Sequence, residues 1–498
     1  MGGSGRRTGA RGHGRRGRAS AAFLAAAAAV SALAVANSGT RGAARASPAQ
    51  TRPNVVVVET DDQTQESMKV MRSVNSLIGG AGTTFRRSFV NYSLCCPSRS
   101  TFLTGQYAHN HGVWSNQEPQ GGFARFESLH ADNNLATWLQ DAGYYTAMIG
   151  RYLNGYTYSP RVPPGWSEWR ATANQNVYDY TLDENGHFVR YGHDPSDFKQ
   201  DVLTDKAVGL IDRRAPKDQP FFLWLTYTAP HAGGPWNDPN PPHDCDNAPK
   251  PAPRDAHKFD NEPLPQRPNF DEADVSDKPA RIRNRPRLNK TAIAYIQRNY
   301  RCELESLLSV DDGVKRVVEA LRDNGELADT LIVYTSDNGF FHGEHRIAQG
   351  KTGIYEESIR VPLLVRGPGI PRDKTVGALA VNADLAPTIV DATDAKPGLV
   401  MDGRSLIPEA ADPGIERGRE LLVEQPSFQA LRTGRYMYAE YTSGERELYD
   451  LRNDPYELHS RHDDPAYASV RSKLAARLRL LRDCSGPGCR LHRPDPTP

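Results

Sequence analysis

Short apolar runs alternate with amphipathic helical patterns along most of the chain. The run at residues 54–60 contains four consecutive valines, and such a β-branched run is typical of a strand buried on both faces of a parallel sheet. Similar runs lie at residues 145–149, 221–225, 331–334 and 361–365, with helical patterns between them at 135–142, 201–213 and 304–324. Strands that alternate with helices predict an α/β fold with a large, mostly parallel sheet flanked by helices.

The pattern changes at two places in the second half of the chain. Residues 235–290 contain many prolines among charged residues and almost no apolar periodicity, which indicates a long surface insertion rather than a domain. After about residue 403 the elements become shorter, with strands expected at 420–423, 428–432, 436–441 and 446–451 and a helix at 468–481. We therefore expect a main domain over residues 52–402, which includes the insertion, and an α+β subdomain over residues 403–498 with a small antiparallel sheet plus a helix.

Residues 1–46 differ from the rest of the chain in composition. They contain eight arginines and no Asp, Glu or Lys, and an Ala-rich apolar run covers residues 19–36. A charged segment, an apolar run and small-residue motifs at 34–36 and 44–46 are the features of a signal peptide. Ala is only weakly apolar, which favours cleavage over the alternative of a membrane anchor. We expect a secreted or extracytoplasmic protein without stable membrane insertion, and the pair Arg15-Arg16 leaves both the Sec and the twin-arginine export routes open.

The chain after residue 46 is mildly acidic, because loss of the eight arginines changes the formal net charge from +1 to −7. An extended nucleic-acid surface needs a basic stripe, so nucleic-acid binding is disfavoured. A local basic pocket for an anionic substrate remains compatible with this charge.

Six cysteines in an exported chain indicate disulfides. Cys484 and Cys489 would close a short glycine-containing loop, and a second bridge could join Cys245 to Cys302. Adjacent cysteines rarely bond to each other because the geometry is strained, which leaves Cys95 and Cys96 unassigned.

Polar side chains follow two of the expected strands. Asp61 and Asp62 end the first strand, and Asp337-Asn338-Gly339 follows the strand at 331–334. Ligand sites of parallel α/β sheets lie beyond the carboxyl ends of the strands, so these oxygens are expected to meet there. Oxygen ligands suit a hard cation such as Ca2+, and zinc is disfavoured because neither motif contains His or Cys. The alternative is that these residues are solvated turn formers.

Cys95 stands immediately before an expected helix start, with Pro97 in the first turn and Arg99 one turn further. An anion bound there would meet backbone N–H groups and a guanidinium. From the residues alone, Cys95 is either a buried small hydrophobe or a thiolate whose pKa is lowered by the helix end. The loop of cysteine-dependent phosphatases does not fit, since it needs five residues between Cys and Arg and three are present.

These motifs together resemble the sulfatase family of the alkaline-phosphatase superfamily, over nearly everything from Pro53 to about His459. The family signature Cys-x-Pro-Ser-Arg, followed by Leu-Thr-Gly, is present at residues 95–99 and 103–105. The family's Asp-Asp and Asp-Asn-Gly motifs are present too, and residues 449–451 and 454–457 resemble its C-terminal signature. The resemblance implies an alkaline-phosphatase-like fold and a sulfuric ester hydrolase that releases inorganic sulfate.

The resemblance also implies a cofactor and a maturation partner. Cys95 would be oxidised to formylglycine by the formylglycine-generating enzyme, and the modified side chain would join Asp61, Asp62, Asp337 and Asn338 around one Ca2+. One hydroxyl of the hydrated aldehyde attacks the sulfur, and the second helps to expel sulfate afterwards. Cys96 would be a structural neighbour.

Four further residues match family positions where charge must be stabilised or a proton donated. Arg99, Arg151 and Lys351 are the expected cations around the sulfate oxygens, and His231 is the expected acid that protonates the leaving alcohol. Many family members have Lys in place of Arg151 and a His near Leu153 that acts in sulfate release. This chain has no such His, so the base for sulfate release is left unidentified.

The substrate is expected to be a sulfated glycan or a small sulfate ester. The Tyr-Leu-Asn sequence at 152–154 and the Cys-Cys pair resemble the N-acetylglucosamine-6-sulfatase and heparan-sulfate sulfatase branch, which implies a 6-sulfated N-acetylglucosamine-type glycan, with aryl sulfates as further substrates. His109 and His111 would either line the sugar side of the pocket or cap a helix. The alternatives are a phosphonate or phosphate monoester hydrolase with the same site and an inactive glycan-binding homologue.

Overall fold

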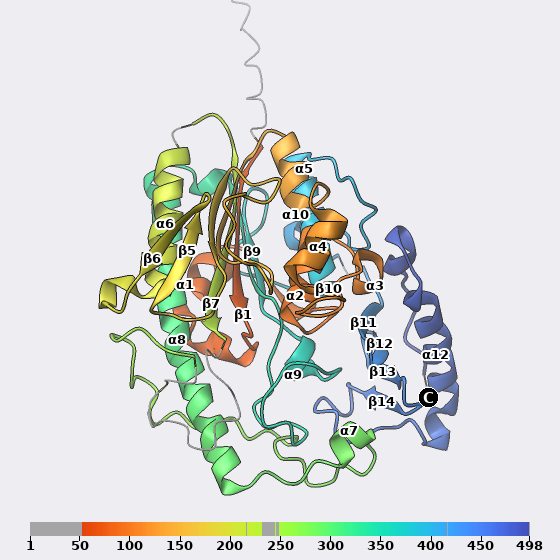
Figure 1. The fold of residues 1–498 in the computed structure, drawn as a ribbon. Helices are drawn as coiled ribbons and strands as arrows, with labels where there is room; N and C mark the ends of the chain where they lie inside the picture. The colour runs from red at the N-terminus through yellow and green to blue at the C-terminus, as the bar shows by residue number, and fades with distance from the viewer. Residues whose placement is uncertain (1–51, 216, 232–244, 246–248, 416, 498) are drawn as a thin grey trace, which may run out of the picture. The chain divides into compact units, whose positions relative to one another are not determined.

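A ten-stranded sheet forms the centre of the protein (Figure 1). This computed structural model describes residues 52–215, 217–231, 245, 249–415 and 417–497. β9 and β5 are antiparallel to their neighbours, and the other strands share one direction. In sheet order the strands are β10 (Lys374–Val381), β2 (Thr83–Phe89), β9 (Leu363–Arg366), β8 (Thr330–Ser336), β1 (Asn54–Asp61), β7 (Phe221–Pro230), β3 (Tyr145–Arg151), β4 (Glu168–Thr172), β5 (Tyr180–Glu184) and β6 (His187–Tyr191). The mostly parallel α/β prediction is confirmed.

Helices cover both faces of this sheet (Figure 1). The valines of β1 alternate between two cores: Val55 and Val57 pack on one face, and Val56 and Val58 pack on the other. This double burial explains the uninterrupted apolar sequence of β1. The helices are α1 (Arg72–Val74), α2 (Cys95–Thr104), α3 (Ala108–His111), α4 (Gly122–His130), α5 (Leu135–Asp141), α6 (Lys199–Arg214), α7 (Ala280–Arg283), α8 (Lys290–Asp323), α9 (Glu356–Ile359), α10 (Leu385–Thr393), α11 (Ile407–Ala411) and α12 (Ala468–Arg482).

The two cores separate the helices into two layers. The core on the Val56 face contains α6 and α8, which also pack against each other. The core on the Val55 face contains α2, α4, α5 and α10. α8 begins at Lys290, well before the predicted start at residue 304, because Ile296 and Tyr300 continue its buried face and Asn289 caps it.

A four-stranded antiparallel sheet follows in the C-terminal part, as predicted. Its strands are β11 (Leu421–Gln425), β12 (Phe428–Arg432), β13 (Tyr436–Tyr441) and β14 (Arg446–Asp450). One face of this sheet packs against Val470, Leu474 and Leu478 of α12 within a third core. That core also contains Phe89 and Ile359, so the small sheet is joined to the large one through buried apolar contacts.

The expected insertion at 235–290 is described at residue 245 and from 249 onward; residues 235–244 and 246–248 lie outside the described residues. The described part consists mainly of turns and irregular chain with the short helix α7. Val275 enters the third core, and a disulfide joins Cys245 to Cys302 of α8. A second disulfide joins Cys484 to Cys489, so both suggested bridges are present.

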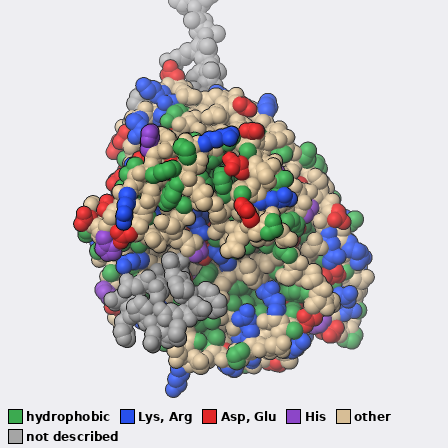
Figure 2. Space-filling view, in the orientation of Figure 1, with side chains coloured by type: hydrophobic (Ala, Val, Ile, Leu, Met, Phe, Trp, Pro, Cys, Tyr) green, Lys and Arg blue, Asp and Glu red, His purple; other side chains and the backbone are tan. Residues whose placement is uncertain are grey.

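The signal peptide predicted at 1–46 lies outside the described residues. Among the described residues, no helix combines the length and the apolarity that a membrane crossing requires. Acidic and basic side chains are interspersed over the face seen in Figure 2.

Candidate functional site

The predicted site residues meet at the carboxyl ends of the central strands. Asp61 ends β1, Asp337 and Asn338 follow β8, Arg151 ends β3 and His231 follows β7. β1 pairs in parallel with both β7 and β8, and β7 pairs in parallel with β3, so these strand ends lie side by side. The N-terminus of α2 supplies Cys95 to the same place.

The acidic residues and Asn338 form a connected group. Asp61 is fully buried, and Asp62 follows it with φ of +69°, in the left-handed region. The Asn338 Nδ2 donates to Asp62 Oδ1 over 2.6 Å, and the Asp62 backbone N–H donates to Asp337 Oδ1 over 3.2 Å. This turn therefore brings the ends of β1 and β8 into one polar cluster.

Cys95 is the first residue of α2, one position later in the helix than the sequence predicted. Its side chain is fully buried, its Sγ lies 3.5 Å from Asp61 Oδ1, and the Lys351 Nζ donates to Sγ over 2.8 Å. Burial, followed by the negative charge of Asp61, raises the pKa of the Cys95 thiol. The thiolate alternative is therefore disfavoured in the unmodified protein.

Arg99 lies behind the carboxylates. Its side chain has no exposed surface, and all three of its nitrogens contact protein groups. The Nε lies 3.0 Å from Asp337 Oδ2 and 3.4 Å from Glu59 Oε1, one terminal nitrogen lies 3.2 Å from Asp61 Oδ2, and the other donates to the Arg151 carbonyl over 2.7 Å. These contacts make Arg99 a group that positions the acidic residues.

Arg151, Lys351 and His231 border the cluster on its more open side. Arg151 bonds to Asp61 Oδ2, and Lys351 Nζ lies 2.5 Å from Asp62 Oδ1 and 4.0 Å from Asp61 Oδ1. His231 Nε2 lies 3.6 Å from Asp62 Oδ2, and its side chain is 19% exposed. The partial exposure of Lys351 and His231 gives these two groups access to a bound molecule, whereas Arg151 is buried.

The electrostatics of the site result from close packing of opposite charges. Burial would raise the pKa of Asp61, but Arg151, His231 and Arg99 hold it below its ordinary value. Burial and the neighbouring Asp61 raise the pKa of Asp337 to about 6. Burial would lower the pKa of Lys351, but Asp62 and Cys95 hold it above its ordinary value. Burial lowers the pKa of His231 despite the two nearby aspartates.

The donor atoms of this cluster fit a divalent cation. One donor atom each of Asp61, Asp62, Cys95 and His231 lie within 4.8 Å of one another. Asn338 Oδ1 is buried and has no hydrogen-bond partner among the described residues. Buried amide oxygens are normally satisfied, so this atom is available as a ligand. The oxygens of this set favour a hard cation such as Ca2+.

Two residues of the site were not identified from the sequence. Gln175 follows β4, and in the orientation that satisfies both of its amide atoms its oxygen accepts from Arg151 over 2.9 and 3.1 Å. Glu59 is buried inside β1, where burial raises its pKa to about 8. The presence of an acid within the otherwise apolar sequence of β1 is the feature that could have identified Glu59. Gln175 lies in no recognisable sequence motif.

His109 and His111 contact protein groups around α3. His109 Nδ1 lies 3.0 Å from Glu424 of β11, and its Nε2 lies 2.8 Å from the Cys484 carbonyl. His111 is fully buried, with its Nε2 3.1 Å from Thr101 Oγ1 of α2. Both imidazoles thus contact protein groups, and His109 joins α3 to the C-terminal sheet.

Two protein-family models match the chain. The model described as Sulfatase matches residues 53–395, and the model described as N-sulphoglucosamine sulphohydrolase, C-terminal, matches residues 343–484. The two matches together cover the large sheet and the small one.

Relatives and solved structures agree with the family models. A putative extracellular sulfatase Sulf-1 homolog of Caenorhabditis elegans is 36% identical over 71% of this chain, but the chain spans only 48% of that protein. N-acetylglucosamine-6-sulfatase of Capra hircus is 33% identical, covering 91% of this chain and 87% of that protein. A solved structure in complex with its substrate D-glucosamine-2-N,6-O-disulfate has a TM-score of 0.71 at 24% identity, covering 86% of this chain and 97% of that one, which shows a shared fold.

Proposed function

Because the chain belongs to the sulfatase family, we propose that it hydrolyses sulfate esters, and that its substrate is a glycan bearing 6-sulfated N-acetylglucosamine. The names of the relatives support sulfate ester hydrolysis as the reaction class. The N-acetylglucosamine-6-sulfatase relative matches over most of both chains, and this supports the choice of sugar.

The observation that carries the proposal is the surroundings of Cys95. The side chain starts α2 beside Asp61 and receives a hydrogen bond from Lys351. Arg151 and His231 border the same carboxylates. One nucleophile position, two cations and one imidazole around an acidic cluster are the parts that transfer of a sulfuryl group requires.

Each side chain has a role that follows from its position. Lys351 and Arg151 would bind the sulfate oxygens and stabilise the charge that develops on them. His231, which lies beside Asp62, would deliver a proton to the departing sugar oxygen. Arg99, enclosed by Asp61, Asp337 and Glu59, would keep the acidic residues in place.

We also propose the maturation of the site. Asp61, Asp62, Asp337 and Asn338 would hold one Ca2+ beside residue 95. Formylglycine made from Cys95 supplies a hydrated aldehyde as nucleophile, and the cation increases the acidity of its hydroxyl. The formylglycine-generating enzyme would be the maturation partner, and the protein would act after secretion.

The first test combines mass spectrometry with kinetics. The peptide containing residue 95 from active protein should show conversion of the thiol to an aldehyde. Cys95→Ala should abolish turnover of N-acetylglucosamine-6-sulfate and of an aryl sulfate. Cys96→Ala, which alters the adjacent buried cysteine, is the matched control and should keep activity within tenfold. An unmodified thiol in active protein would refute the mechanism.

The second test separates the sulfatase from its alternatives. Paired aryl sulfate and aryl phosphonate substrates should show a preference for sulfate, and a preference for phosphonate would favour the phosphonate hydrolase. Turnover of neither would favour a glycan-binding protein without activity. A chelator should remove activity and Ca2+ should restore it, and indifference to both would contradict the proposed ligand set.

A further inference from the structure

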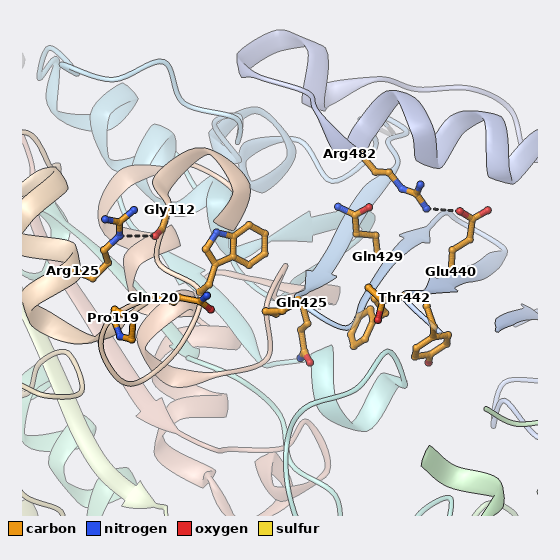
Figure 3. A pocket seen from close by; sticks show the side chains of 13 residues that line it. Gly112, Pro119, Gln120, Arg125, Gln425, Gln429, Glu440, Thr442 and Arg482 are labelled. Atoms are coloured by element: carbon orange, nitrogen blue, oxygen red, sulfur yellow. Dashed lines mark hydrogen bonds and ion pairs between the residues drawn. The ribbon is translucent and has the colours of Figure 1, made fainter. Parts of the chain in front are cut away.

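A pocket of about 760 Å³ lies between the loop after α3 and the small C-terminal sheet. Figure 3 shows Gly112, Pro119, Gln120 and Arg125 on one side, and Gln425, Gln429 and Thr442 on the other. Its volume is within the range of small-molecule sites in proteins. None of the residues assigned above to catalysis or metal binding lines it.

Contacts on both sides of Cys95 connect the walls of this pocket to the catalytic site. On the first wall, Tyr92 OH donates to the Trp114 carbonyl over 2.6 Å. Asn116 lies in the chain between the lining residues Trp114 and Pro119, and its Oδ1 accepts from the Cys96 backbone N–H over 2.9 Å. On the second wall, the Gln425 Nε2 donates to Ser93 Oγ over 3.2 Å. The lining residues Trp114 and Gln425 therefore contact residues 92 and 93, and the chain between Trp114 and Pro119 contacts residue 96, so the segments that form the pocket are joined to both flanks of the nucleophile position.

The lining of the pocket is suited to a carbohydrate. Trp114 is half-buried and packs edge to face against Tyr92, with ring centroids 6.3 Å apart, so its ring is held by its neighbour while part of it borders the pocket. Aromatic rings present a flat apolar surface of the kind that packs against a sugar ring. The side-chain amides of Gln120, Gln425 and Gln429 line the same space and can pair with hydroxyl groups.

The charges of the pocket favour an anionic occupant. Arg482 bonds to Glu440 on the C-terminal wall, which neutralises both charges. On the opposite wall the Arg125 Nε donates to the Gly112 carbonyl over 3.2 Å, which fixes the guanidinium beside the pocket. The charged residues that line the pocket thus carry one net positive charge, from Arg125. A guanidinium can bind a sulfate or carboxylate through two parallel hydrogen bonds.

We infer that this pocket binds the sugar units next to the residue that is desulfated, in an anionic oligosaccharide. Trp114 packs against a sugar ring, and Arg125 binds a sulfate or carboxylate on the neighbouring unit. The inference rests on the proposed function for the identity of the reacting unit, and it makes the enzyme selective for chains over monosaccharides.

The test compares two substrates on two pocket variants. Arg125→Gln and Trp114→Ala should each lower kcat/KM at least tenfold for a sulfated tetrasaccharide that ends in 6-sulfated N-acetylglucosamine. For the monosaccharide N-acetylglucosamine-6-sulfate the change should be less than twofold. Arg190→Gln and Phe188→Ala, which alter exposed residues of β6, are matched controls and should leave both values unchanged. Equal losses on both substrates, or no loss on either, would overturn the inference.

A binding measurement separates this inference from the proposed function. Calorimetry of the tetrasaccharide on the Cys95→Ala protein should show binding that Arg125→Gln weakens at least tenfold and that rising salt also weakens. If the enzyme hydrolyses neither substrate but Arg125→Gln weakens binding of the tetrasaccharide, the proposed reaction is wrong and the inference about the pocket is supported. If binding is unaffected by both pocket variants, the pocket is not a glycan site.

Discussion

Arg99 offers the sharpest test of how the site is built. Its guanidinium is enclosed by Asp61, Asp337 and Glu59, at 3.2, 3.0 and 3.4 Å. Arg99→Met keeps much of the side-chain length and removes the charge and every hydrogen bond. The three acidic side chains would then lose a shared cationic partner while they remain buried.

The expected cost follows from burial. Removing one partner of a buried ion pair costs about 3–5 kcal/mol, because the other partner remains buried without compensation. Unfolding entropy is about 2.1 cal/mol/K per residue, so for the roughly 450 residues from Thr51 to Pro498 one kcal/mol corresponds to about 1 °C. We therefore expect Arg99→Met to lower Tm by about 3–5 °C and kcat by more than about 100-fold, an effect typical of lost electrostatic preorganisation.

The assay is calorimetric unfolding together with steady-state kinetics. Arg316→Met is the control, because Arg316 pairs with Asp205 on the surface, with exposures of 45% and 62%. Such a pair contributes at most about 1 kcal/mol, so Tm should fall by no more than about 1 °C. An unchanged Tm in Arg99→Met with a large rise in KM would show that Arg99 binds substrate, and the positioning role would be wrong.

Three further predictions concern stability and strand packing. Burial, with nearby Glu356 and Glu357, raises the pKa of Glu457 well above its ordinary value of 4.5. The folded state then binds more protons than the unfolded state, so the free energy of unfolding should fall above pH 4.5 by up to about 1.4 kcal/mol per pH unit. Denaturation measured from pH 4 to 8 should show this slope, and the slope should be weaker in Glu457→Gln. Replacing Cys245 and Cys302, which are 57 residues apart, by Ala should lower the free energy of unfolding by about 4 kcal/mol. Replacing Cys484 and Cys489, which are 5 residues apart, should lower it by about 2 kcal/mol, because the closed loop is shorter. Equal decreases in the free energy of unfolding in urea would contradict the loop-closure argument. Gly150 has φ of +119°, and a Cβ there would lie 1.9 Å from the Thr226 carbonyl oxygen, so Gly150→Ala should displace Arg151 and lower both Tm and kcat. Gly377→Ala in β10 is the control and should leave both unchanged, because no atom of the described residues lies within 4 Å of its Cβ position.

The central strands and the site at their ends could be predicted because a strand buried on both faces has an uninterrupted apolar sequence. The outer strands carry a weaker one. β2 contains Arg86 and Arg87, β6 has an exposed face, and β10 begins with exposed Lys374 and Thr375, so none of them formed an apolar run in the sequence. These strands are stabilised by pairing with their neighbours, and the sequence of a single segment does not indicate such pairing.

The candidate site divides in the same way. The acidic strand ends and the Cys95 segment were identifiable because each is a local motif placed at a strand or helix end. The enclosure of Arg99 was not, because it depends on β1, β3 and β8 surrounding one helical turn of α2. Gln175 reaches Arg151 from a loop with no motif of its own. Contacts that join distant segments are decided by the assembled fold.

The complete enclosure of Cys95 has a consequence for chronology. An oxidising enzyme cannot reach a side chain with no exposed surface at the start of a helix packed against the large sheet, so the proposed conversion must precede the docking of α2. A molecule that folds before Cys95 is oxidised would keep the unmodified thiol for as long as its core remains folded. The active fraction of a preparation would then be fixed during synthesis. It would depend on the relative rates of folding and modification rather than on any later treatment.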